Sequence, residues 1–93
     1  LVIDPTKFSV TYQGIQIRLT ATEFRLLHYL ACRPGRVFSR EQLLNQTVGS
    51  NVVVVDRNID VHIRGIRKKI GNDTQFIETI RGIGYRFIDV RSE

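Results

Sequence analysis

The chain has 93 residues, 42% of them hydrophobic and 25% charged, which allows one modest core and excludes a disordered or two-domain protein. Fourteen Lys and Arg residues against nine Asp and Glu give a net charge of +5, which favours nucleic acid as a partner but also fits a merely soluble basic protein. One cysteine excludes an internal disulfide, and no apolar run approaches the ~20 residues that span a membrane, so we expect a reducing, cytoplasmic environment.

Residues 1–19 show the two-residue alternation that is typical of β-strands. Gln13-Gly14 predicts the turn of a hairpin, and Asp4-Pro5-Thr6 predicts an earlier turn. We therefore expect a small antiparallel sheet over about residues 1–19, with residues 1–3 as a further strand. The alternating apolar side chains of the hairpin are Phe8, Val10, Tyr12, Ile15, Ile17 and Leu19.

A capping box begins the first predicted helix, because Glu23 follows Thr20 by three residues. The helix covers about residues 21–32, with Leu19 packed on Phe24 across its first turn, and Pro34-Gly35 ends it. Cys32 lies near the end of the apolar run, where we expect a buried structural thiol and not a nucleophile. The buried stripe of this helix is Leu26, Leu27, Leu30 and Ala31.

A second capping box, formed by Ser39 and Gln42, predicts a helix over about residues 40–47. Phe38 is placed to pack on Leu43 across the first turn of this helix. Residues 49–51 then break the helix, and the apolar run 52–55 leads to a third helix over about residues 57–70, with Asp56 as its cap.

The third helix has an apolar face and a basic one. Its apolar residues fall within one narrow stripe and must face the core: they are Ile59, Ile63, Ile66 and Ile70. The opposite face holds the residue types that contact bases in a major groove, namely arginine for guanine, asparagine for adenine and an aliphatic group for the thymine methyl. These outward residues are Arg57, Val61, Arg64 and Lys68, flanked by Asn58 and Gly65, with His62, Arg67 and Lys69 toward the edges.

An ordinary solvated helix face is the alternative for this basic surface. Val61 argues against it, because solvent gives an apolar side chain no reason to occupy the middle of a polar face. Gly65 also argues against it, since glycine costs about 1 kcal/mol of helix propensity, which close approach of a ligand would explain. Asp60 can pair with Arg64 or Arg57 one turn away and fix an arginine head group.

Residues 76–90 predict two strands joined by a turn that contains Gly82 and Gly84. Two glycines beside an arginine resemble part of a phosphate-binding loop, but the third glycine and the following helix are missing. The order of sheet, three helices and hairpin predicts an α+β fold, the winged helix-turn-helix, in which the hairpin is the wing. Arg81 at the hairpin tip is then the natural minor-groove probe.

Four segments resemble the effector domain of OmpR/PhoB-type two-component response regulators: LTATEFRLL (19–27), VFSREQLL (37–44), DRNIDVHIR (56–64) and TIRGIGYRF (79–87). The resemblance implies a winged-helix domain over 1–93, with a sheet about 1–19, a three-helix core about 20–70 and a wing about 76–90. It implies that Arg81 enters the minor groove. The residues implied at the major groove are Arg57, Asn58, Val61, His62, Arg64, Arg67 and Lys68. Those implied at phosphates are Arg40, Thr79 and Tyr85.

The same resemblance implies partners: double-stranded DNA with direct repeats at promoters, RNA polymerase through the loop 48–55, an upstream receiver domain with its sensor kinase, and head-to-tail dimers on DNA.

Three positions depart from the family. Val48 stands where a tryptophan is common, Val55 where an acidic residue is common, and Gly65 where a member of the family has a base-reading arginine. The target sequence therefore does not carry over.

Three classes of function remain open: a DNA-binding transcription regulator, a winged helix that contacts protein or RNA, and an enzyme. The pattern brings no nucleophile, carboxylate pair or metal cluster near either His28 or His62, which disfavours catalysis. We expect no cofactor, metal or membrane partner. The absence of methionine indicates one domain cut from a longer protein.

Overall fold

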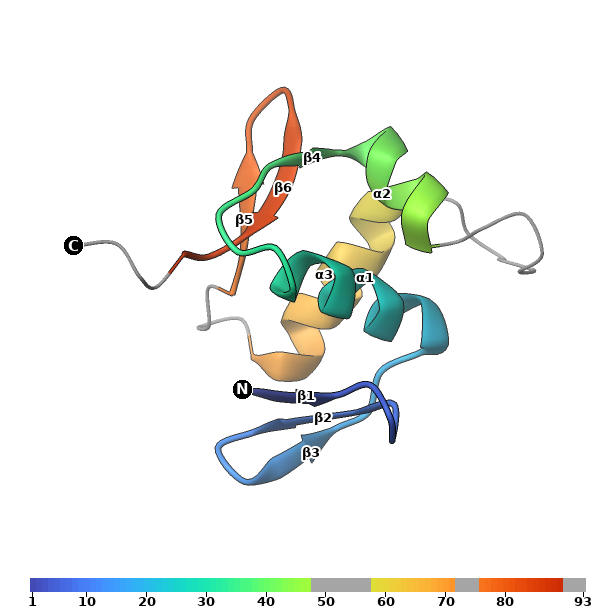
Figure 1. Cartoon of the computed structure of the whole chain (residues 1–93), viewed down its shortest axis with the longest axis vertical. Coiled ribbons are helices and arrows are strands. Elements are labelled where there is room, and N and C mark those ends of the chain that lie inside the picture. Colours follow the sequence, from blue (N-terminus) through green and yellow to red (C-terminus); the bar gives the residue numbers. More distant parts are fainter. Residues whose placement is uncertain (48–57, 72–75, 90–93) are drawn as a thin grey trace.

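The computed structural model describes residues 1–47, 58–71 and 76–89, in which three helices lie between an N-terminal sheet and a C-terminal hairpin (Figure 1). This arrangement confirms the predicted α+β winged-helix class. The elements in chain order are β1 (Val2–Asp4), β2 (Ser9–Tyr12), β3 (Ile15–Ile17), α1 (Ala21–Ala31), β4 (Phe38–Ser39), α2 (Arg40–Thr47), α3 (Ile59–Ile70), β5 (Ile77–Ile80) and β6 (Gly84–Phe87).

The N-terminal sheet is antiparallel in the order β1-β2-β3, as predicted. Its turn at Gln13 and Gly14 has φ values of 52° and 80°, a left-handed pair that suits the twist of a two-residue hairpin. Ile3, Val10 and Ile17 stand opposite one another across the three strands and pack toward the core, where Val10 is fully buried. The sheet therefore supports the helices from one side.

Helix α1 begins at the predicted capping box. The Thr20 hydroxyl accepts from Glu23 N at 3.1 Å, and Glu23 Oε1 accepts from Thr20 N at 3.0 Å. The predicted leucines Leu26, Leu27 and Leu30 are fully buried, whereas Ala31 is only half-buried. The prediction for Cys32 was wrong: this residue is the C-cap of the helix and its thiol is exposed, 3.4 Å from His28 Nε2, because the core-facing stripe ends before it.

Helix α2 has the predicted bounds and the predicted box, in which Ser39 Oγ accepts from Gln42 N at 3.1 Å and Gln42 Oε1 accepts from Ser39 N at 2.9 Å. Phe38 and Leu43 are both buried. The strand β4 just before this helix was not predicted. It adds to the hairpin as a third strand, which gives the sheet order β4-β6-β5.

Helix α3 buries all four predicted isoleucines in the core. Its start was predicted too early, because the helix begins at Ile59 and Asn58 is its cap: Asn58 Oδ1 accepts from Asp60 N at 2.9 Å. Asp56 and Arg57 lie outside the described residues, as do residues 48–55, where a loop was predicted.

The hairpin β5-β6, which we call the wing, turns at Gly82, whose φ of 78° is left-handed. Gly84 was predicted to form the turn, but it is the first residue of β6 and pairs with Ser39 of β4. A Cβ at Gly84 would lie 1.9 Å from the Phe38 carbonyl oxygen. Glycine is therefore required at this position because β4 packs against it.

Candidate nucleic-acid interface

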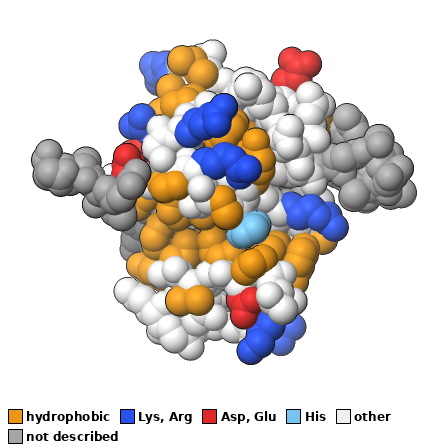
Figure 2. Space-filling model, in the orientation of Figure 1, with side chains coloured by type: hydrophobic (Ala, Val, Ile, Leu, Met, Phe, Trp, Pro, Cys, Tyr) orange, Lys and Arg blue, Asp and Glu red, His pale blue; other side chains and the backbone are white. Residues whose placement is uncertain are grey.

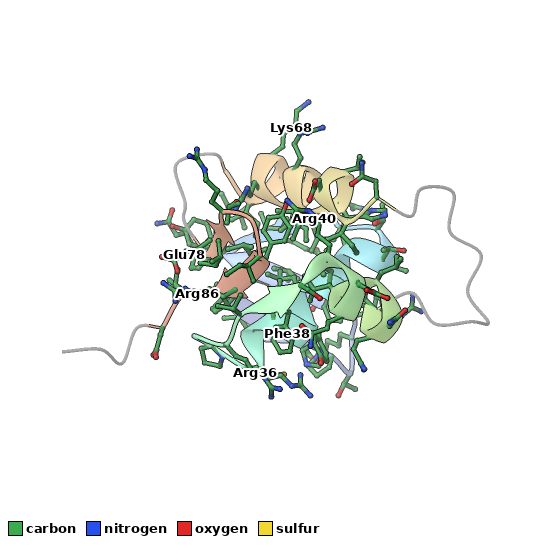
Figure 3. The ribbon with its side chains drawn as sticks, turned by 90° about the horizontal axis from the view of Figure 1, so that it is seen from above. Arg36, Phe38, Arg40, Lys68, Glu78 and Arg86 are labelled. Carbon is green, nitrogen blue, oxygen red and sulfur yellow. The ribbon has the colours of Figure 1, made fainter. Side chains whose placement is uncertain are left out.

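The outer face of α3 is basic and exposed. Arg64 and Lys68 are exposed and make no ion pair within residues 58–71 or the other described segments, and Val61, one turn before Arg64, is 37% exposed. Figure 3 shows Lys68 pointing away from the protein, on the side opposite Arg36 and Phe38. The face that carries α1 differs, because hydrophobic side chains gather over its centre (Figure 2). The surface expected for a base-contacting helix is thus present on one side of the molecule.

Asn58 and His62, two predicted major-groove residues, lie at the margins of this face. The Asn58 side-chain oxygen caps α3, and a bidentate contact to adenine needs that same oxygen together with the amide nitrogen. The oxygen has two lone pairs, so an adenine contact would share it with the cap. His62 is half-buried, and Arg57 lies outside the described residues.

Arg67 lies between α3 and the wing. Its Nη2 donates to the Ile77 carbonyl at 2.7 Å and to Thr79 Oγ1 at 2.9 Å, so the guanidinium holds β5 against the helix. This engagement leaves Arg67 poorly placed for a base, although the sequence placed it at the edge of the outer face. Thr79 is exposed and accepts the bond from Arg67, which leaves its hydroxyl hydrogen available to a phosphate.

The Asp60 carboxylate joins α3 to α2 and to the wing. Its Oδ1 accepts from Arg40 Nε at 2.7 Å and from the Tyr85 hydroxyl at 2.5 Å. The hydrogen bond from Tyr85, together with that from Arg40, holds the pKa of Asp60 below its ordinary value. Arg64, one of the two predicted partners of Asp60, forms no ion pair with it, although the charge of Arg64 also lowers the pKa of this carboxyl. The other predicted partner, Arg57, lies outside the described residues.

Tyr85 is 4% exposed, and two guanidinium groups lie near its ring: the Cζ atoms of Arg40 and Arg67 are 5.4 Å and 5.7 Å from its centroid. Burial, followed by the Asp60 carboxylate, raises the pKa of the Tyr85 hydroxyl. That hydroxyl donates its hydrogen to Asp60, so it has no hydrogen left for a phosphate. Arg40 retains further N–H donors and a 47% exposed side chain, so it can still meet one.

The wing tip presents Arg81, Gly82 and Ile83, all exposed. Ile83 is among the exposed large hydrophobic side chains, and the sequence pattern did not predict a role for it. Its position two residues after Arg81 in a turn was the available signal. An apolar side chain and a guanidinium at the point of a hairpin are the two groups that minor-groove proteins insert.

Gly65 contacts Glu23 of α1, and this contact corrects our ligand-based explanation of the glycine. A Cβ at Gly65 would lie 2.2 Å from Glu23 Oε2. The Glu23 side chain is 8% exposed, and its Oε1 accepts from Thr20 N and from Lys69 Nζ, the latter at 2.7 Å. The Lys69–Glu23 ion pair was not predicted, although the position of Glu23 beside core residues of α1 was a signal for it.

The described residues contain no group of three or more His, Cys, Asp or Glu side chains that could hold a metal ion. No helix in the described segments is long and apolar enough to cross a membrane. The described side chains at the centre of the outer face of α3 are arginine, lysine and one aliphatic group, with the Asp60 carboxylate beside them.

Solved structures share this fold and bind DNA. The DNA-binding domain of the response regulator AdeR, in complex with an intercistronic region, has a TM-score of 0.80 and 31% identity, with 95% of this chain and 93% of that chain covered. The RstA DNA-binding domain of Klebsiella pneumoniae, in complex with the RstA box, has a TM-score of 0.77 and 32% identity over 92% of this chain and 88% of that one. The fold and its basic helix define a winged-helix DNA-binding domain.

The sequence profile of the family described as "Transcriptional regulatory protein, C terminal" matches residues 14–87. The phosphate regulon transcriptional regulatory protein PhoB of Escherichia coli is 47% identical over 89 residues, with 94% of this chain covered. The chain belongs to this family, the OmpR/PhoB-type effector domains of two-component response regulators. It spans 39% of the length of the E. coli relative.

Proposed function

We propose that this domain recognises a specific double-stranded DNA site, with α3 in the major groove and the wing tip in the minor groove. The observation that carries the proposal is the two-sided α3, whose isoleucine stripe is buried while Arg64, Lys68 and Val61 are exposed together on the outer face. An arginine fork fits guanine, and an aliphatic group fits the thymine methyl.

The proposed contacts fall into three groups: contacts with bases, contacts with phosphates, and residues that support the wing from behind the interface. Base edges are contacted by Arg64 and Val61, and Arg81 enters the minor groove. The further major-groove residues are Arg57, Asn58, His62 and Lys68. Arg40 and Thr79 hold phosphates, because both are exposed and keep donors beyond their internal bonds. Arg67 and Tyr85 act behind the interface as supports of the wing, which revises the roles inferred from sequence.

We further propose that the domain works within a longer regulator in the cytoplasm, with a receiver domain upstream and a sensor kinase as its input. The E. coli relative is named as a transcriptional regulatory protein, and 39% of its length matches this chain, which supports a larger whole. Head-to-tail dimers on direct repeats and contact of the loop 48–55 with RNA polymerase belong to the same proposal. The role is binding and not catalysis, consistent with the donor-rich face.

Selection of duplexes from a random pool tests this function. We expect enrichment of one motif, and binding to that motif should weaken as salt rises, because phosphate contacts release counterions. The selected and scrambled duplexes are then compared at one fixed salt concentration. Enrichment of no motif, or equal affinity for both duplexes, would contradict sequence-specific recognition and leave only general attraction to a polyanion.

A further inference from the structure

Asp60 is a carboxylate on the α3 side that we propose faces DNA. Its side chain is 37% exposed, and it lies one turn before Arg64 on the same helix. A negative charge near the phosphate backbone opposes DNA binding. Since this charge weakens general attraction to any duplex, we looked for a structural role in the contacts that the carboxylate makes within the domain.

The contacts of Asp60 show that it joins three elements of the fold. One oxygen accepts from Arg40 of α2 and from Tyr85 of β6, while Asp60 itself belongs to α3, so three elements meet at a single atom. Figure 3 shows Arg40 between α2 and α3. At the other strand of the wing, Arg67 of α3 holds the Ile77 carbonyl. Both wing strands are thus tied to α3, one through Asp60 and the other through Arg67.

These ties fix the place of the wing tip relative to the helix. Simultaneous contact with a major groove and the adjacent minor groove requires the two elements to keep one spacing. A wing that is free to move would let Arg81 settle on any nearby phosphate, which adds affinity without adding sequence information. A held wing contributes fully only where the duplex offers both grooves in the correct relation.

We propose that Asp60 is a specificity-determining positioning residue, which gives up general DNA affinity in order to hold the wing and Arg40 in the geometry that a cognate site requires. This inference rests on the proposed function. It assigns the carboxylate a role through Tyr85 and Arg40, and no direct contact with a base. The Asp60 carboxylate is ionised at neutral pH, where both bonds are charge-assisted.

The test uses two variants that remove the same charge. Asp60→Asn removes the central carboxylate, and Glu78→Gln removes a carboxylate of the wing that is 38% exposed and pairs with Arg86 on the neighbouring strand. Figure 3 shows Glu78 beside Arg86 on the wing, away from Lys68. Affinities of this chain are measured by fluorescence anisotropy on the selected duplex and on a scrambled duplex at one salt concentration.

The proposal predicts effects of opposite sign for Asp60→Asn. Affinity for the scrambled duplex should rise because a repulsive charge is gone, while affinity for the selected duplex should fall. The ratio of the two should decrease about tenfold, the effect of losing one charge-assisted hydrogen bond. Glu78→Gln should raise both affinities slightly and leave their ratio unchanged. If Asp60→Asn raises both affinities equally, Asp60 is only a repulsive charge and the proposal is overturned.

Tyr85→Phe provides a variant that leaves the charge unchanged. It removes only the hydroxyl that donates to Asp60, so the affinity ratio should fall, and any rise on the scrambled duplex should be smaller than for Asp60→Asn because the carboxylate charge remains. An unchanged ratio for Tyr85→Phe in a folded protein would contradict the proposal, even if Asp60→Asn fails to fold. If the wild-type chain itself shows no preference between duplexes, the proposed function fails, an outcome distinct from failure of the role of Asp60.

Discussion

Replacing Gly65 with alanine should change the stability of the domain in two opposite ways, through helix propensity and through a clash with Glu23. Alanine in a helix interior is favoured over glycine by ~1 kcal/mol, so the substitution alone should stabilise α3. The new Cβ, however, would lie 2.2 Å from Glu23 Oε2. That carboxylate cannot simply turn away, because its other oxygen holds Thr20 N and Lys69 Nζ.

The stability lost at the bonds of Glu23 should exceed the stability gained in helix propensity. A hydrogen bond to a charged group contributes ~1.5 to 3 kcal/mol, and the Lys69 pair adds at most ~1 kcal/mol because the lysine side chain is 39% exposed. Weakening these bonds therefore outweighs the gain in helix propensity. We expect Gly65→Ala to lower the free energy of unfolding by ~1 kcal/mol in the wild-type chain.

A double-mutant cycle separates the two effects. In the Glu23→Ala background the clash is absent, and Gly65→Ala should raise the free energy of unfolding by ~1 kcal/mol. Urea unfolding followed by circular dichroism measures all four proteins. If Gly65→Ala stabilises both backgrounds equally, Glu23 does not restrict this position, and our explanation of the glycine is incorrect.

The site also predicts the effects of changes at Arg64, Arg81 and Asp60. Arg64→Ala should cost ~1 to 3 kcal/mol on the selected duplex and relax preference at one base pair, and equal weakening on scrambled DNA would indicate a phosphate contact instead. Arg81→Ala should weaken binding most where the sequence that flanks the site is A·T-rich, and Arg81→Lys should restore little of the affinity. Equal losses on A·T-rich and G·C-rich flanks, with rescue by Arg81→Lys, would show that the wing only attracts the phosphate backbone. Because the folded pKa of Asp60 is lowered, its contribution to stability is present above the unfolded pKa of ~4 and is lost as pH falls through the folded value. The difference in unfolding free energy between wild type and Asp60→Asn should accordingly shrink in acid, and a pH-independent difference would argue against the pairing.

Local signals in the sequence predicted much of the fold. The capping boxes at Thr20 and Ser39 involve residues three positions apart, so the side chain and the backbone that it binds are near each other in any helix. The isoleucines of α3 repeat at the helical period, and burial follows from that period once a core exists.

Contacts between distant segments were not predictable in the same way. Asp60 had a plausible partner one turn away in Arg64, but the structure brings Arg40 and Tyr85, 20 and 25 residues distant, to the same oxygen. Helical spacing says which residues share a face, and it does not say which other element packs against that face. Gly65 was assigned to a ligand for the same reason, because Glu23 of α1 fills the space beside it.

The central claim is that α3 contacts base edges in the major groove, and guanine analogues test it most directly. Replacing a guanine of the selected duplex by 7-deazaguanine removes the N7 acceptor from the major groove. For the guanine that Arg64 contacts, we expect the wild-type chain to lose affinity and the Arg64→Ala variant to lose no more. If both proteins lose the same affinity at every guanine, or neither loses any, Arg64 does not contact a guanine N7 and α3 does not recognise the site in the way we propose.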